Sequence, residues 1–214
     1  MRVLLAPALA CLLVFCLWPG WALDSNRLLA AAERLGPHAV VEAQALVRMI
    51  ERTATLGEAQ RLTVINSFFN QHIAFREDLE VWGQADYWAS PLESLGKGRG
   101  DCEDYAIAKY FSLIAAGAPA ERLRLVYVRA RLGGQSVAHM VLAYYALPEA
   151  EPLILDNLVP EVRPASQRPD LQPVFSFNAD GLWRGVGAAS AGGDPLARLS
   201  QWRDVIAKAR AEGF

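Results

Sequence analysis

The chain has 214 residues, with 21 basic and 23 acidic side chains, so its formal net charge at pH 7 is −2. This balance, without any long basic run, argues against a function in nucleic-acid binding. Beyond the first residues of the chain, no apolar stretch approaches the roughly 20 residues that a membrane-spanning helix needs.

Residues 1–22 have the pattern of a secretory signal peptide. Arg2 provides the short basic region, a nearly continuous apolar stretch follows, and small residues stand one and three positions before a cleavage site after Ala22. We therefore predict export of the chain, with residues 23–214 forming one domain. An N-terminal anchor that stays uncleaved is the alternative.

Cleavage after residue 22 would leave one cysteine. Cys11 and Cys16 would be removed with the leader, and Cys102 would remain. A lone cysteine in an exported protein cannot form an internal disulfide. It is either a small buried apolar side chain or a reactive thiol, and the cysteine count alone does not decide between them.

The first half of the chain is predicted to be helical. Polar caps, apolar residues at helical spacing and Gly or Pro at the breaks indicate helices at residues 24–35, 38–54 and 58–71. Residues 76–100 are predicted to be an aromatic-rich loop with one helical turn at 91–95. Residues 102–116 are apolar on most faces, which is typical of a buried helix.

The second half of the chain is predicted to form an antiparallel sheet. Runs rich in β-branched and aromatic residues indicate strands at 123–132, 137–147, 152–156 and 173–178, with a hairpin turn at 133–136. A last helix is predicted at 195–211. Helices followed by a sheet and a closing helix give the fold class α+β.

Three residues of different segments suggest nucleophilic catalysis. Cys102 begins the predicted buried helix, His139 lies within the second strand, and Asp156 ends the third. A cysteine protease needs a thiolate, an imidazole beside it and a third group that orients the imidazole. Each residue alone has a structural explanation, as a buried thiol, a core histidine or a turn aspartate. Their order and placement together predict a catalytic triad.

The carboxylates around this cysteine need an explanation of their own. Asp101, Glu103 and Asp104 can stabilise a helix N-terminus, with Asp101 as the N-cap. Yet their negative charges oppose ionisation of the neighbouring thiol. A bound Ca²⁺ would reverse that effect, and three carboxylates within four residues suit its preference for oxygen ligands. We therefore predict a calcium site at these three residues, with helix capping as the alternative.

The segments RGDCEDYAIAKY, AHMVLAYY and LILDNL resemble the bacterial transglutaminase-like cysteine proteinases, in particular the LapG-type proteases among them. The resemblance implies a papain/transglutaminase-like fold, in which a helical N-terminal part and a central buried helix pack on an antiparallel sheet. It implies that Cys102 is the nucleophile, His139 the base and Asp156 its orienting partner. Calcium dependence is implied as well.

The same resemblance implies a biological role. It predicts a periplasmic endopeptidase that cleaves the N-terminal region of a large biofilm adhesin and releases it from the cell surface. It also predicts an inhibitory partner, an inner-membrane cyclic-di-GMP receptor of the LapD-like type. Two alternatives remain at this point: a transglutaminase-type acyl transferase with the same triad, and a non-catalytic calcium-binding protein of the same fold.

Overall fold

The computed structural model describes residues 23–187 and 195–214. The predicted signal peptide at residues 1–22 therefore lies outside the described residues. Within the described ranges, no helix combines the length and the apolar composition that crossing a membrane requires.

The helical first half agrees with the prediction, and its local signals explain where the helices begin. The three long helices are α1 (Ser25–Leu35), α2 (Pro37–Ala54) and α3 (Glu58–His72). Asp24 caps α1 because its side chain accepts a hydrogen bond from the backbone N–H of Arg27 at 3.0 Å. Proline at the first position of α2 lacks an N–H group, but an N–H at this position would have no partner within the helix.

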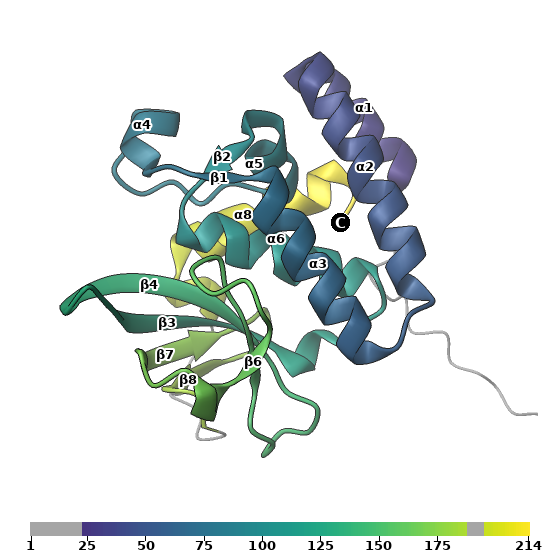
Figure 1. Cartoon of the computed structure of the whole chain (residues 1–214). Coiled ribbons are helices and arrows are strands. Elements are labelled where there is room, and N and C mark those ends of the chain that lie inside the picture. Colours follow the sequence, from purple (N-terminus) through teal and green to yellow (C-terminus); the bar gives the residue numbers. More distant parts are fainter. Residues whose placement is uncertain (1–22, 188–194) are drawn as a thin grey trace, which may run out of the picture.

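Helix α6 (Cys102–Ala115) forms the centre of the molecule, and every residue from Glu103 to Ile114 is buried. It packs against the sheet on one side and against α3 and the short helix α5 (Pro91–Lys97) on the other (Figure 1). The predicted buried helix is confirmed. Its apolar circumference is needed because both of its sides face other elements.

The sheet is antiparallel and has six strands in the order β6-β5-β4-β3-β7-β8. These are β3 (Leu123–Leu132), β4 (Gln135–Tyr144), β5 (Leu153–Leu155), β6 (Arg163–Pro164), β7 (Leu171–Phe177) and β8 (Leu182–Arg184). Gly133 and Gly134 turn the β3–β4 hairpin with φ values of 56° and 84°, which favour glycine. Because this turn takes only two residues, β4 begins two residues earlier than predicted.

Several short elements were not predicted. They are the strands β1 (Ala74–Phe75), β2 (Arg99–Gly100), β6 and β8, the helix α4 (Asp78–Trp82), and the 3₁₀ turns η1 (Ala120–Arg122) and η2 (Ala165–Gln167). The helix predicted at 195–211 is wrong as one piece. It consists of α7 (Pro195–Arg198) and α8 (Ser200–Glu212), because Leu199 between them has a non-helical backbone, with φ −115° and ψ 87°.

The parallel pair β1–β2 closes the loop that precedes α6. The backbone N–H of Ala74 donates to Gly98 at 2.9 Å, and that of Arg76 donates to Gly100 at 3.0 Å. The two ends of this long excursion are thereby joined next to Cys102. Helix α4 and the acidic residues around it are consequently held near the N-terminus of α6.

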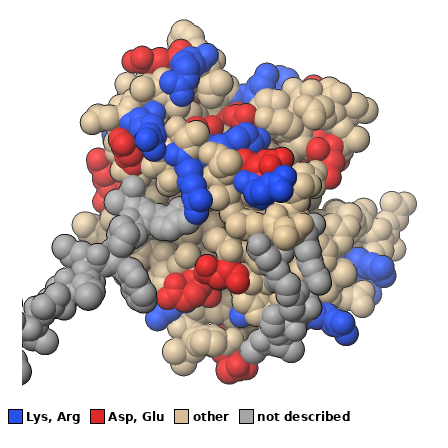
Figure 2. Space-filling model, turned by 180° about the vertical axis from the view of Figure 1, so that it is seen from behind, with Lys and Arg blue, Asp and Glu red and all other residues tan. Residues whose placement is uncertain are grey.

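The face turned away from the viewer in Figure 1 carries charges of both signs. In Figure 2, acidic and basic side chains are intermingled over the described part of this face. A mixed surface of this kind gives no strong single-sign field to steer a charged partner.

Substitution of two leucines tests whether packing around α6 stabilises the fold. Leu113 on α6 is completely buried, whereas Leu147 is 66% exposed. Leu113→Ala should lower the free energy of unfolding by about 2–5 kcal/mol, because it leaves a cavity in the core. Leu147→Ala should change it by less than about 0.5 kcal/mol. Urea unfolding of both variants checks this, and equal losses would contradict a core centred on α6.

Candidate active site

Cys102 is the first residue of α6, and close packing restricts which residues can stand just before it. A side chain at Gly100 would lie 2.5 Å from Oδ2 and 2.9 Å from Cβ of Asp104, so only glycine fits. Asp101 occupies the N-cap position, but its side chain makes no capping hydrogen bond. The N–H groups at the start of the helix give Cys102 a partially positive surrounding, while the carboxylate of Asp101 makes no capping hydrogen bond and stays available for another role.

His139 and Asp156 form a buried pair on neighbouring strands. Strands β4 and β5 are paired in the register Leu142–Leu155, and Asp156 follows directly after β5. Nε2 of His139 lies 2.8 Å from Oδ1 of Asp156, and the two residues are 5% and 1% exposed. The structure therefore brings together the two residues that the sequence placed 17 positions apart. Because this contact uses Nε2, the other ring nitrogen of His139, Nδ1, takes no part in it.

Cys102 meets His139 in a cleft made of two cavities. One cavity, of about 410 Å³, has walls that include Trp88, Tyr127 and Phe175. The other, of about 520 Å³, includes Phe75, Leu132 and Leu158. Both cavities are lined by Cys102 and His139. The thiol and the imidazole thus lie where the two halves of the cleft meet.

The protein groups around the sulfur disfavour a thiolate. Burial raises the pKa of the Cys102 thiol well above its usual range, and the charges of Glu103 and Asp101 raise it further. A hydrogen bond from the backbone N–H of Met140, the residue after His139, acts in the opposite direction. The thiol itself donates to Oε2 of Glu103 at 3.2 Å. A positive charge near these carboxylates would be needed to make the sulfur a strong nucleophile.

The carboxylates around Cys102 belong to a larger acidic cluster. Ligand oxygens of Asp78, Asp101 and Asp104 lie within 4.8 Å of one another, and so do those of Asp78, Asp86 and Glu103. The three residues predicted as calcium ligands therefore all lie in the cluster but do not form one compact set. Asp78 on α4 and Asp86 in the following loop join them.

The cluster fits a hard cation. Oδ1 of Asp78, Oδ1 of Asp101 and Oδ2 of Asp104 are buried, and none has a hydrogen-bond partner within the described part of the chain. Burial raises the pKa of Asp104 well above its usual range and, together with the nearby Glu103, raises that of Asp101 to about 9. Burying such oxygens without a partner is costly, and six to eight oxygen ligands are what Ca²⁺ takes.

Asp78 and Asp86 were missed because they lie far from the cysteine in sequence. Their segment did carry a signal, since four acidic residues stand within the aromatic-rich loop at 76–100 before Ser90: Glu77, Asp78, Glu80 and Asp86. That density indicates a cation site only once the β1–β2 pair is known to fold the loop back over α6.

The carboxylate of Asp156 is held from several directions. Oδ1 accepts hydrogen bonds from the backbone N–H groups of Asn157 and Leu158 at 2.7 and 3.1 Å, in addition to its contact with His139. Oδ2 accepts from Nη2 of Arg168 at 2.7 Å. Burial by itself would raise the pKa of Asp156, but these hydrogen bonds and charges outweigh it and lower the pKa to about 2. Asp156 is therefore ionised at neutral pH.

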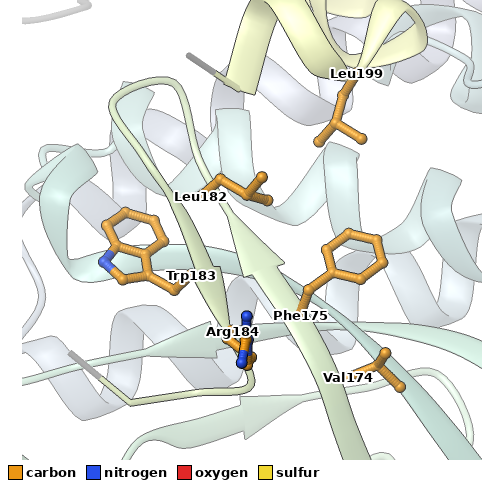
Figure 3. Close-up of a pocket in the computed structure, with 6 residues that line it drawn as sticks. All are labelled: Val174, Phe175, Leu182, Trp183, Arg184 and Leu199. Atoms are coloured by element: carbon orange, nitrogen blue, oxygen red, sulfur yellow. The ribbon is translucent and has the colours of Figure 1, made fainter. Parts of the chain in front are cut away.

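An apolar pocket of about 360 Å³ adjoins the first cavity of the cleft. Figure 3 shows its side chains on β7, on β8 and at the residue between α7 and α8, with Phe175, Leu182 and Leu199 turned toward a common space. Phe175 and Leu199 also line the cavity of Cys102. The pocket and the cleft thus share a wall.

Comparison with known proteins agrees with this geometry. The family model of the bacterial transglutaminase-like cysteine proteinases (BTLCP) matches residues 41–170, a range that contains Cys102, His139 and Asp156. The chain belongs to this family. No protein of curated function matches the chain.

Solved structures of LapG from Legionella pneumophila are similar to this chain over most of its length. An EGTA-treated form is 38% identical, with a TM-score of 0.76, and the match covers 88% of this chain and 98% of that one. A calcium-bound form is 38% identical, with a TM-score of 0.73, and covers 86% and 98%. The family membership and the LapG-like fold predicted from the sequence are confirmed.

The ionised state of Asp156 can be tested through stability. Its pKa is lowered from 3.8 to about 2, so its charge stabilises the fold above pH 3.8, and this contribution is lost as the pH falls through about 2. The shift corresponds to about 2 kcal/mol. Asp156→Asn should therefore be less stable than the wild type at pH 7, and the difference should shrink below pH 4.

Urea unfolding at several pH values measures this difference, with the exposed Asp180→Asn as the control. If the gap between wild type and Asp156→Asn were the same at pH 7 and pH 3, Asp156 would not be held in its ionised form.

Proposed function

We propose that the chain is a calcium-dependent periplasmic cysteine endopeptidase with the triad Cys102, His139 and Asp156. The observation that carries this proposal is the buried His139–Asp156 pair, which shares a cleft with the thiol at the N-terminus of α6. Membership in a family of cysteine proteinases supports it. A non-catalytic calcium-binding protein would have no need for an oriented imidazole beside a thiol.

The geometry supports acyl transfer through a covalent intermediate. The Cys102 sulfur attacks the carbonyl carbon of the substrate peptide, and its proton passes to His139. The N–H groups at the start of α6 stabilise the oxyanion, and His139 returns the proton to the leaving amine as the C–N bond breaks. Water, deprotonated by His139, then attacks the thioester carbon, the C–S bond breaks, the acid is released and His139 returns the proton to the Cys102 sulfur. Asp156 holds the imidazole in place throughout.

The two-sided cleft favours an endopeptidase. Because cavities extend from Cys102 in two directions, a peptide chain can lie across the thiol with residues bound on both sides of the scissile bond. Internal cleavage of an extended segment is therefore the activity that suits this shape.

Calcium would be held by Asp78, Asp101, Glu103 and Asp104, with Asp86 at the edge of the cluster. When bound, it supplies the positive charge that offsets these carboxylates next to the thiol. The unpartnered oxygens of Asp78, Asp101 and Asp104 support this assignment. The existence of calcium-bound and EGTA-treated structures of the similar Legionella LapG points to the same ion.

The proposed substrate is the N-terminal region of a large biofilm adhesin, which cleavage would release from the cell surface. The proposed inhibitory partner is an inner-membrane cyclic-di-GMP receptor of the LapD-like type, and the signal peptide at residues 1–22 would deliver the protease to the periplasm. The resemblance to LapG-type proteases is the support for these assignments. No part of the proposal involves nucleic acid.

Cys102→Ala should abolish cleavage of an adhesin fragment, since it removes the attacking sulfur, while the fold and the calcium affinity stay largely intact. Gel electrophoresis after incubation with and without Ca²⁺ measures cleavage, and circular dichroism checks the fold. Retained cleavage would contradict the triad. A crosslinked product in place of two fragments would instead indicate a transglutaminase-type acyl transferase.

Asp104→Asn tests the cation site by two opposite effects on thermal stability. In EGTA its melting temperature should equal or exceed that of the wild type, because the cost of burying this carboxyl group, which raises its pKa, is gone. On addition of Ca²⁺ its melting temperature should rise less than that of the wild type, because a ligand is lost.

Differential scanning fluorimetry measures both effects, and Asp204→Asn on the exposed face of α8 is the matched control. An unchanged wild-type melting temperature and unchanged turnover in excess EGTA would show that these carboxylates hold no calcium.

A further inference from the structure

A buried arginine stands behind the proposed triad. Arg168 follows η2 and precedes β7, and it is only 3% exposed. Its Nη2 donates to Oδ2 of Asp156 at 2.7 Å and to Oδ2 of Asp170 at 2.7 Å, and its Nε donates to Oδ1 of Asp170 at 3.0 Å. The guanidinium thus bridges two carboxylates from a fixed plane.

The hydrogen bond from Arg168 fixes the orientation of the Asp156 carboxylate relative to the imidazole of His139. Oδ1 is used by His139 and by two backbone N–H groups, while Oδ2 is occupied by Arg168. Rotation of the carboxylate would break the bond to Arg168, which is itself held by Asp170. The hydrogen bond from Arg168 therefore determines which carboxylate oxygen of Asp156 faces His139.

We propose that Arg168 is a positioning residue, which acts through Asp156 to hold His139 in its catalytic orientation. This inference rests on the proposed function, because it assigns a role within the same site. Desolvating an arginine is costly, and the energy of a buried ion pair often does no more than offset that cost. A positioning role explains why the site contains the guanidinium.

Three groups face Asp156, and they differ in whether they act on it by a hydrogen bond or by charge alone. His139 approaches from β4, Arg168 from the segment before β7, and Lys109 from α6. Lys109 is completely buried, and its Nζ has no hydrogen-bond partner in the described part of the chain, so it acts on Asp156 only through space. Burial lowers the pKa of Lys109 to about 7, so in assays run below that pH Lys109→Met removes a cationic group near Asp156 without removing a hydrogen bond to it.

The kinetic experiment compares Arg168→Gln, Arg168→Lys, Lys109→Met and the surface control Arg122→Gln with the wild type, using an adhesin fragment and saturating Ca²⁺. Arg168→Gln should lower kcat about 10- to 100-fold with KM changed by less than about threefold. This is well short of the roughly 10⁴-fold loss that follows when the orienting carboxylate itself is neutralised. Arg168→Lys should recover part of the loss, because an ammonium reaches Oδ2 but cannot hold both carboxylates as a fork does.

A second experiment reads the orientation of His139 without any substrate. The chain has only three histidines, so the imidazole signals are assigned by NMR with His38→Gln and His72→Gln. The Nε2 proton that bonds Asp156 should give a far-downfield resonance in the wild type, in Arg122→Gln and in Lys109→Met. In Arg168→Gln this resonance should broaden or move upfield.

The outcomes separate the two proposals. A lower melting temperature of Arg168→Gln with unchanged kcat and an unchanged His139 resonance would show a purely structural arginine and overturn the inference. An equal loss of kcat in Lys109→Met would also overturn it, since charge alone would then be responsible. If the wild type cleaves no better than Cys102→Ala, the proposed function fails, and the His139 resonance still decides the role of Arg168.

Discussion

The acidic N-terminus of a buried helix is the constraint on which this site depends. Helix α6 lies between the helical layer and the sheet, so its first turn is inside the molecule and beside β4. That position places Cys102 next to His139, but it also buries Asp101, Glu103 and Asp104 with little solvent to screen them. The same turn thus carries the proposed nucleophile and creates an excess of negative charge around it. The proposed calcium ion would resolve this conflict, because its positive charge would offset these carboxylates.

The surrounding elements can be understood as supports for that turn. The β1–β2 pair returns the loop at 76–98 to the helix and brings Asp78 into the cluster. On the other side, the β3–β4–β5 sheet delivers His139 and Asp156 on paired strands. Arg168 then fixes Asp156 from the segment that leads into β7. Three parts of the chain therefore support the turn that carries Cys102, and Arg168 does so indirectly through Asp156.

The sequence predicted the parts of this arrangement that local patterns encode. The helix at 102–116 is apolar on most faces, and the glycine pair before β4 turns a hairpin, so both elements followed from spacing and turn chemistry. The family, and with it the fold, followed from the segments around Cys102, His139 and Asp156. Asp78, Asp86 and Arg168 did not, because each meets the site through contacts between residues distant in the chain. The break at Leu199 was missed because the apolar stripe continues across it and only the backbone angles change.

We propose that a cation at the carboxylates makes the Cys102 sulfur reactive, and the alkylation rate of this sulfur measures that effect. Iodoacetamide should label Cys102, the only cysteine of residues 23–214, at least about tenfold faster in saturating Ca²⁺ than in excess EGTA at neutral pH. Both rates should be measured well below the melting temperature, with circular dichroism showing the same fold in each condition. A labelling rate that is equal in the two conditions, or faster in EGTA, would contradict the account.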